Sequence, residues 1–300
     1  MKKTTIKHIG VFLKPSKIED LGNIITNLVR WLAKREKKVF FCEFEYDRLK
    51  KILGPKVFSQ VTFLAEKELH KKSQLLMSLG GDGTLLGVAR QSRINIPVMG
   101  VNLGHLGFIT EFQKNEFYEY LPHIFSNKFQ TVKKNLYSVE IFEKNKSIKK
   151  EYFFNDAVFT QNTIARIISL SVETENEHIF NLSGDGLIVS STYGSTAYSM
   201  AAGGPIVHPD VKALLLTPIC PHSLTHRPLV MPDNKPVIVS STKSLENISI
   251  TLDGQTHIIL GKNERAIIKK ENRKGVLLVK NPDRTYFHTL KEKFEHGSRK

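Results

Sequence analysis

The sequence predicts an α/β N-terminal domain followed by an all-β C-terminal domain. Up to about residue 130, short apolar runs alternate with segments whose apolar side chains recur at helical spacing. From Tyr137 onward, short runs typical of strands follow one another and are separated by polar turns. The chain has 300 residues, of which 40% are hydrophobic, and this is enough for one large domain or two ordinary ones.

The N-terminal elements are expected to form a parallel sheet. Apolar runs predict strands over residues 8–13, 38–42, 75–79 and 96–101, and the spacing over residues 20–34 predicts a helix. A second helix should begin after the glycines that follow the third of these strands. Strands that alternate with helices form a Rossmann-like parallel sheet covered on both faces. The ligands of such sheets bind at the carboxyl ends of the strands.

Short strands dominate the second half of the chain, and they place the second domain at residues 136–281, after a first domain at 1–135. The predicted strands cover residues 138–142, 157–161, 167–174, 186–190, 237–241, 248–252, 266–270 and 276–280. The last apolar side chains recur at helical spacing and predict a final helix. They belong to Tyr286, Phe287, Leu290 and Phe294.

A glycine-rich turn, Gly-Gly-Asp-Gly-Thr at residues 80–84, lies between a predicted strand and a predicted helix. Glycine lets a ligand approach the backbone closely, and the N–H groups at a helix start favour an anion such as phosphate. A carboxylate would repel that phosphate, so Asp82 suggests a general base or a metal contact beside a phosphoryl group. The alternative is a tight turn in which Asp82 caps the helix.

A second segment rich in glycine, serine and threonine follows the Gly-Asp-Gly of residues 184–186. It includes Gly-Ser-Thr-Ala-Tyr-Ser at residues 194–199, and Gly-Gly-Pro follows at 203–205. Hydroxyl groups and backbone donors at this density suit a polar ligand rich in ribose and phosphate oxygens. On composition alone, however, an ordinary loop rich in serine and threonine is the better explanation.

Composition argues against several other classes of protein. The net charge of +15 and the pI near 9.6 suit a nucleic-acid-binding protein, but the lysines are scattered and no nucleic-acid-binding motif accompanies them. No apolar run is long enough to span a bilayer, and no secretory signal follows the basic N-terminus. The two cysteines, Cys42 and Cys220, have no metal-like spacing. We therefore expect a cytoplasmic protein without nucleic-acid or membrane partners.

Together, these motifs resemble those of the NAD kinase family. Phe-Asn-Asp-Ala-Val at residues 154–158, Asn-Leu-Gly-His-Leu-Gly-Phe at 102–108 and Leu-Asp-Gly-Gln at 252–255 match further family segments. All of these motifs occur in family order over nearly the whole chain. The segments Ala-Gly-Gly-Pro-Ile at 202–206 and Arg-Pro-Leu-Val at 227–230 are most similar to the enzymes of Gram-negative bacteria.

The resemblance implies ATP-dependent phosphorylation of NAD at the adenosine 2′-hydroxyl, which gives NADP. Asp82 would be the general base, and Mg²⁺ would arrive with ATP rather than in a dedicated metal site. The resemblance also implies a homo-oligomer, here expected to be a tetramer, in which the β-rich domain binds NAD and forms the contacts between copies. Residues 282–295 are expected to return to the first domain, which would bind ATP and phosphate.

The resemblance also implies a set of ligand contacts. They are Gly81, Gly83, Thr84, Asn155, Asp156, Arg166, Asp185, Thr196, Ala197, Tyr198, Ser199 and Gln255. Asp156 replaces the glutamate that is usual in the family, and so it keeps the charge with a shorter reach. Two alternatives stay open: a lipid or sugar kinase of the same superfamily, and a non-catalytic dinucleotide-binding sensor. The segment at 194–199 argues against the first, and the presence of Asp82 argues against the second.

Overall fold

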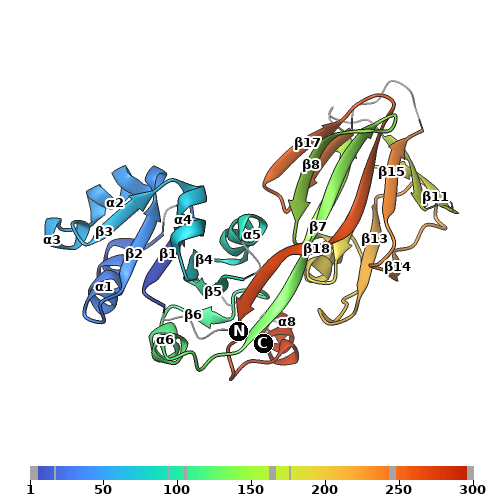
Figure 1. Cartoon of the computed structure of the whole chain (residues 1–300). Coiled ribbons are helices and arrows are strands. Elements are labelled where there is room, and N and C mark those ends of the chain that lie inside the picture. Colours follow the sequence, from blue (N-terminus) through green and yellow to red (C-terminus); the bar gives the residue numbers. More distant parts are fainter. Residues whose placement is uncertain are drawn as a thin grey trace. The chain divides into compact units, whose positions relative to one another are not determined.

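The computed structural model describes residues 6–16, 18–92, 95–104, 107–161, 167–175, 177–242 and 248–295. The chain forms two compact units (Figure 1). The α/β unit comprises residues 1–134 and 275–300, and the β unit comprises residues 135–274. Among the described ranges, no helix is both long and apolar enough to cross a membrane.

Parallel strands form the sheet of the α/β unit. Their order is β18-β5-β4-β1-β2-β3, and the short strand β6 pairs with β5. Their bounds are β1 His8–Leu13, β2 Lys38–Cys42, β3 Val61–Leu64, β4 Leu75–Gly80, β5 Pro97–Asn102, β6 Phe112–Gln113 and β18 Glu264–Val279. Every residue of β4 and β5 is buried, as is typical of central strands covered on both faces.

Helices of the α/β unit follow its strands along the chain, as in other α/β sheets. Their bounds are α1 Leu21–Ala33, α2 Tyr46–Ile52, α3 Pro55–Phe58, α4 Glu66–Lys72, α5 Asp82–Gln91, α6 Phe117–Phe125 and α8 Tyr286–Glu295, with a short 3-10 helix at Glu43–Glu45. Helix α1 buries Ile25, Leu28 and Leu32, because these positions recur on one of its faces. They share one core with strand residues such as Ile9 and Met77.

The predicted strands β1, β2, β4 and β5 and the predicted helices α1 and α5 are confirmed. The sequence pattern does not predict the elements between residues 43 and 72, which include α2, α3, β3 and α4. Each of these four spans seven residues or fewer, and no residue of β3 is fully buried. A hydrophobic period is therefore too short to be recognised there.

The β unit contains two sheets that face each other across one core. One sheet has the order β14-β13-β12-β9-β16-β17, and the other joins β11-β10-β15-β18, with β7 beside β18 and β8 beside β7. The strand bounds are β7 Thr131–Glu143, β8 Lys146–Phe153, β9 Asp156–Gln161, β10 Ile168–Thr174, β11 Glu177–Gly184, β12 Gly186–Ser191, β13 Ala213–Ile219, β14 Leu229–Pro232, β15 Val237–Ser241, β16 Ile248–Leu252 and β17 Thr256–Leu260. Phe159 and Leu187 from the first sheet meet Val139 and Leu170 from the second in this core.

The predicted order of an α/β part and then a β-rich part is confirmed. The prediction of two separate strands near the end of the chain is wrong, because they form one strand. Residues 266–270 and 276–280 belong mostly to the single strand β18. It pairs with β15 in antiparallel fashion at residues 265–268 and with β5 in parallel at 277–278. The middle of β18 is polar and largely exposed, which gives it the sequence pattern of a turn.

Candidate active site

Asp82 is the first residue of helix α5 and follows the end of strand β4 by two positions. Gly81 precedes it at the N-cap, and no side chain forms a capping hydrogen bond. The interpretation of Asp82 as a helix cap is therefore wrong. Its carboxylate is instead bonded to a loop that lies more than twenty residues further along the chain.

We call residues 107–110 the Asp82 cradle, because Phe108, Ile109 and Thr110 donate four hydrogen bonds that hold the Asp82 carboxylate. Oδ1 accepts the backbone N–H groups of Ile109 and Thr110 at 3.2 and 2.9 Å and the Thr110 hydroxyl at 2.8 Å. Oδ2 accepts a single bond, from the Phe108 N–H at 2.8 Å. The cradle thus fixes the orientation of the carboxylate and gives Oδ1 three hydrogen bonds but Oδ2 only one.

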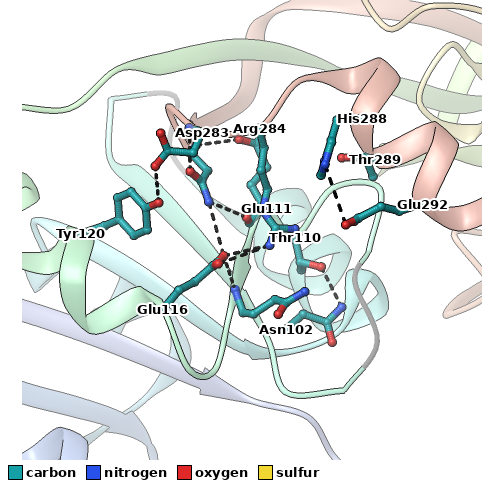
Figure 2. Close-up of polar contacts among 12 residues, drawn as sticks. Asn102, Thr110, Glu111, Glu116, Tyr120, Asp283, Arg284, His288, Thr289 and Glu292 are labelled. Carbon is teal, nitrogen blue, oxygen red and sulfur yellow. Dashed lines mark hydrogen bonds and ion pairs between the residues drawn. The ribbon is translucent and has the colours of Figure 1, made fainter.

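Two features keep the Asp82 cradle close to the carboxylate. A Cβ atom on Gly107 would overlap the Asp82 carboxylate, so a side chain does not fit at this position. The Thr110 hydroxyl accepts a hydrogen bond from the Asn102 side-chain amide at 3.0 Å, as Figure 2 shows. Asn102 ends strand β5, and its side-chain oxygen accepts the Gly104 N–H at 2.9 Å.

The predicted phosphate contacts Gly81, Gly83 and Thr84 flank Asp82. A Cβ atom on Gly81 would meet only the Asn102 Nδ2 atom, at 4.0 Å, so the backbone there borders open space. Gly83 and Thr84 lie in the first turn of α5, where Gly83 is exposed and Thr84 is half-buried. A ligand can therefore reach this stretch of backbone.

In the β unit, Asp253 organises the turn that carries Asn155 and Asp156. Its carboxylate accepts the backbone N–H groups of Phe154 at 3.0 Å, Asn155 at 2.7 Å and Asp156 at 3.2 Å. Asp253 and Gly254 have positive φ angles of 50° and 65°, which an Asp-Gly turn accommodates. In the sequence, Asp253 is visible only as part of an Asp-Gly turn. Its hydrogen bonds to residues 154–156 are therefore not predicted.

Asn155 and Asp156 are buried, with exposed fractions of 8% and 5%. Among the described residues, the Asn155 Oδ1 atom has no hydrogen-bond partner. Burial, and then the nearby Asp253 carboxylate, raises the pKa of Asp156 from 3.8 to about 7. A buried acceptor without a donor is costly, so this pair is suited to receive the hydroxyl groups of a ligand.

The turn that follows strand β12 packs against the same pair. The Ser191 hydroxyl donates to the Phe154 carbonyl at 2.6 Å, and the Ser191 N–H donates to the Asn155 carbonyl at 2.8 Å. A Cβ atom on Gly194 would overlap the Asn155 carbonyl oxygen, which explains the glycine at this close approach. The structure therefore joins the predicted Asn-Asp pair to the start of the glycine- and serine-rich segment.

The predicted contacts at residues 196–199 differ in exposure. Thr196 and Ala197 are half-buried, and Tyr198 is 47% exposed. Ser199 is fully buried, and its hydroxyl shares a 2.8 Å hydrogen bond with Thr217 of strand β13. Ser199 thus braces the short helix α7, Tyr198–Ala201, whereas the three preceding residues are open to a ligand.

Of the remaining predicted contacts that the structure describes, Asp185 lies away from Asp156, and Gln255 lies in the turn that is hydrogen-bonded to Asp156. Asp185 is exposed and directly precedes strand β12, whose other end pairs with Asp156 through Ser190. Asp185 and Asp156 therefore lie at opposite ends of that strand. Gln255 is exposed in the turn that contains Asp253. Arg166 lies outside the described residues.

Two family models match the chain. The ATP-NAD kinase N-terminal domain matches residues 9–129, and the ATP-NAD kinase C-terminal domain matches residues 154–280. The chain belongs to the NAD kinase family. This confirms the resemblance that the motifs predict, and it makes the chain a phosphotransferase, as NAD kinases are.

Members of the NAD kinase family align with most of the chain. The NAD kinase of Solibacter usitatus is 34% identical over 296 residues, which are 98% of this chain and 99% of that protein. The NAD kinase of Aquifex aeolicus is 36% identical over 270 residues, 88% of this chain and 97% of that protein.

Solved structures of the family share the fold. Yeast NADH kinase in complex with NADH aligns with a TM-score of 0.86 at 22% identity, over 99% of this chain and 90% of that one. An NAD kinase from Archaeoglobus fulgidus in complex with ATP aligns with a TM-score of 0.69, also at 22% identity, over 96% of this chain and 98% of that one.

The sequence does not predict which residues surround the Asp82 carboxylate. Asn102 and Gly107 lie inside a segment that matches the NAD kinase family, so their presence is signalled but not their contact with Asp82. Thr110 lies beyond that segment, and nothing in its sequence context marks it. A contact across 28 positions becomes visible only when the fold brings the loop to the helix.

Proposed function

We propose that this member of the NAD kinase family transfers the γ-phosphoryl group of ATP to the 2′-hydroxyl of the adenosine ribose of NAD, with Asp82 as the general base. The observation that supports this most strongly is that the two oxygens of the Asp82 carboxylate accept different numbers of hydrogen bonds. Three donors contact Oδ1 and one contacts Oδ2. Oδ1 is fully occupied by its three donors, whereas Oδ2 accepts only one and can still accept a hydrogen bond from a substrate hydroxyl.

The reaction then needs a single proton transfer at Oδ2. The 2′-hydroxyl oxygen attacks the γ-phosphorus, its proton passes to Oδ2 of Asp82, and the bond between the γ-phosphorus and the ADP oxygen breaks. Positioning and charge neutralisation supply most of the rate in phosphoryl transfer. A correctly placed base adds about 10²–10⁴-fold.

Gly81, Gly83 and Thr84 are proposed to contact the phosphates of ATP, which is supported by the open space beside Gly81. A divalent metal, Mg²⁺ in this proposal, would enter with ATP and be held mainly by phosphate oxygens, which is how Mg²⁺ usually binds. In the described part of the chain, no group of three or more His, Cys, Asp and Glu side chains could hold a metal by itself. Metal that arrives on the nucleotide does not need such a group.

Asn155 and Asp156 are proposed to hold the ribose hydroxyls of NAD. The buried Asn155 Oδ1 atom supports this, since a hydroxyl donor from the ligand would satisfy it. Further contacts are proposed from the segment that contains Thr196, Ala197, Tyr198 and Ser199, and from Gln255 and Arg166. Their support is family membership together with the exposure of the first three.

Contacts from more than one copy are proposed for the NAD site, in a homo-oligomer that we take to be a tetramer. Asp185, directly before β12, and Ser190, the strand partner of Asp156, are five residues apart, which corresponds to about 17 Å at roughly 3.3 Å per residue. Asp185 of one copy would therefore contact NAD held by Asp156 of another. Exposed apolar side chains of the β unit, including Val211 and Leu224, support such an interface.

Two smaller proposals complete this function. Residues 282–295 are proposed to belong to the ATP-binding domain, which is supported by a 2.5 Å hydrogen bond from Tyr120 to Asp283 and a 3.1 Å ion pair between Arg284 and Glu116. A cytoplasmic location is proposed because both cysteines are free thiols.

The decisive experiment incubates the purified chain with ATP, Mg²⁺ and NAD and measures NADP with a coupled dehydrogenase. NADP should accumulate, and Asp82→Asn should abolish turnover while the fold and most of the NAD affinity remain. Asparagine keeps the size of the side chain but cannot accept the proton. If no phosphoryl donor yields NADP, the reaction is wrong; near-normal kcat in a folded Asp82→Asn variant removes Asp82 from the role of base.

A further inference from the structure

Glu111, the residue that follows the Asp82 cradle, is hydrogen-bonded to a segment about 170 positions further along the chain. Figure 2 shows Thr110 and Glu111 beside Asp283 and Arg284 of that segment. Glu111 follows Thr110 directly, and its Oε2 atom accepts the backbone N–H of Asn281 at 2.7 Å. The Glu111 carbonyl accepts a hydrogen bond from the Asn281 side-chain amide at 3.1 Å. Lys280 forms an ion pair with the other carboxylate oxygen of Glu111. Glu111 is therefore held through its side chain and its backbone alike.

Asn281 has one orientation in this contact. Its exposed fraction is 2%, and its Oδ1 atom accepts the Asp283 N–H at 3.0 Å. Its Nδ2 atom donates to the Glu111 carbonyl and also reaches Glu116 Oε1 at 3.4 Å. A buried amide whose donor and acceptor are both engaged cannot turn over without the loss of hydrogen bonds. Asn281 thus acts as a rigid clamp on the residue next to the cradle.

Thr110 connects this clamp to the proposed base. Its exposed fraction is 0%, and it donates both its N–H and its hydroxyl to Asp82 Oδ1. The Asn102 amide can only donate to the Thr110 oxygen, so the single hydroxyl hydrogen of Thr110 must point to Asp82. The direction of the hydrogen bonds from Asn102 through Thr110 to Asp82 is therefore fixed by chemistry.

We propose that Thr110 and Asn281 are positioning residues for the phosphoryl transfer, which rests on the role proposed above for Asp82. Thr110 keeps Oδ1 occupied, so Oδ2 is the oxygen left to take the proton of the 2′-hydroxyl. Asn281 keeps Thr110 in place through Glu111. The terminal torsion of an aspartate is soft, so a carboxylate that loses one anchor rotates away from the reacting hydroxyl. Neither residue contacts the substrate in this scheme.

Steady-state kinetics with ATP, Mg²⁺ and NAD test the role of the Thr110 hydroxyl. Thr110→Val keeps the branched shape and removes the hydroxyl, so kcat should fall about 10- to 100-fold while KM for NAD and for ATP changes little. Thr110→Ser keeps the hydroxyl and should restore most of kcat. If Thr110→Val folds and retains the kcat of the parent, the inference is wrong.

A matched pair of variants tests the clamp. Asn281→Ala should lower kcat about 10-fold, because the cradle loses its outer support. His288→Ala is the control, since His288 lies on the same C-terminal segment in an exposed pair with Glu292 at 3.9 Å and should leave kcat unchanged. Equal kcat in the two variants would overturn the clamp.

Two readouts separate positioning from a merely structural role. In Thr110→Val, kcat and kcat/KM should fall by the same factor, because the lost hydroxyl positions the base and does not bind the substrate. Amide hydrogen exchange at residues 108–110 should accelerate in Asn281→Ala without any substrate, and it decides the question even if Thr110→Val does not fold. Unchanged exchange overturns the inference and leaves the proposed reaction intact. A normal kcat in Asp82→Asn would instead remove the base, and the inference with it.

Discussion

Asp253 and Asp156 are both buried and are joined by two hydrogen bonds: the Asp253 carboxylate accepts the Asp156 N–H at 3.2 Å, and the Asp156 carbonyl accepts the Asp253 N–H at 3.0 Å. The Asp253 carboxylate is stabilised by the backbone N–H groups of three successive residues. Burial, followed by the charge of Asp253, raises the pKa of Asp156 to about 7. Asp156 therefore changes its charge near neutral pH.

The affinity for NAD should depend on this titration. With a pKa of about 7, Asp156 is protonated in acid and becomes a carboxylate as the pH rises. Only the carboxylate makes charge-assisted hydrogen bonds to both ribose hydroxyls, so KM for NAD should fall between about pH 6 and about pH 8. The measurement is KM for NAD against pH at saturating ATP. Asp156→Asn should flatten the curve, and a variant with the parent's curve would exclude Asp156 as its source.

The length of the acidic side chain should matter less than its charge. Asp156→Ala removes an acceptor whose hydrogen bonds are each worth about 1.5–3 kcal/mol, so KM for NAD should rise strongly. Asp156→Glu restores the side chain that is usual in the family, and it should be tolerated or bind NAD more tightly. KM for NAD is compared among the three proteins, with a substrate that lacks these hydroxyls as the control. An unchanged KM in Asp156→Ala would mean that the side chain points away from the ligand.

Gly107→Ala should inactivate the enzyme without unfolding it. The new Cβ atom would overlap the Asp82 carboxylate and force it out of its cradle. We expect kcat to fall by about 100-fold, because a misplaced catalytic group costs about this much. Gly54→Ala is the matched control, since no heavy atom lies within 4 Å of a Cβ atom at Gly54. Loss of activity in both variants would point to a general effect of alanine rather than to the clash.

Lys270 should matter for stability far more than Lys235. Asp233 has an exposed fraction of 6% and accepts hydrogen bonds from Lys270 at 2.6 Å and from the Tyr137 hydroxyl at 3.0 Å. Lys270→Ala leaves a buried carboxylate without its counter-charge and should lower the free energy of unfolding by about 3 kcal/mol.

Lys235→Ala removes only an exposed pair with Glu175 at 3.5 Å and should cost about 0.5 kcal/mol or less. Urea unfolding at neutral pH measures both losses. Similar losses in the two variants would show that Asp233 does not depend on Lys270.

Two variants with weakened NAD binding should complement each other if copies share the NAD site. Asp156 and Asp185 lie beside opposite ends of strand β12, so an oligomer that mixes Asp156→Ala with Asp185→Ala contains some sites with both native carboxyl groups. At a low NAD concentration, the mixed and exchanged variants should be more active than either variant alone, and light scattering should report a tetramer. A fully active monomer would contradict shared sites.

The sequence predicts elements best where a long or fully buried apolar pattern exists. Helix α1 has five buried positions on one face, and β12 is buried along its whole length, so both are predicted. The short elements between β2 and β4 lack such a pattern. Strand β18 is predicted as two strands, because a polar middle separates its two apolar ends.

The candidate site divides in the same way. Asp82, Asn155 and Asp156 lie in motifs with turn-forming neighbours and are predicted as functional residues. Their supports are Thr110 and Asp253, which act through hydrogen bonds to groups that are 28 and 97–99 positions away. Such hydrogen bonds depend on which loops the fold brings into contact, and local residue patterns do not predict these contacts.

Strand β18 also determines when, during synthesis, the parallel sheet of the α/β unit can be completed. A ribosome releases strands β1 to β5 first, then most of the chain, and only near the end the stretch 277–278 that pairs with Pro97 and Val98 of β5. Until then, this part of β5 is an unpaired edge, the feature by which nascent chains attract one another or a chaperone. The α/β unit therefore receives this strand only after the β unit has been made, so translation that stalls before residue 277 leaves the first sheet open.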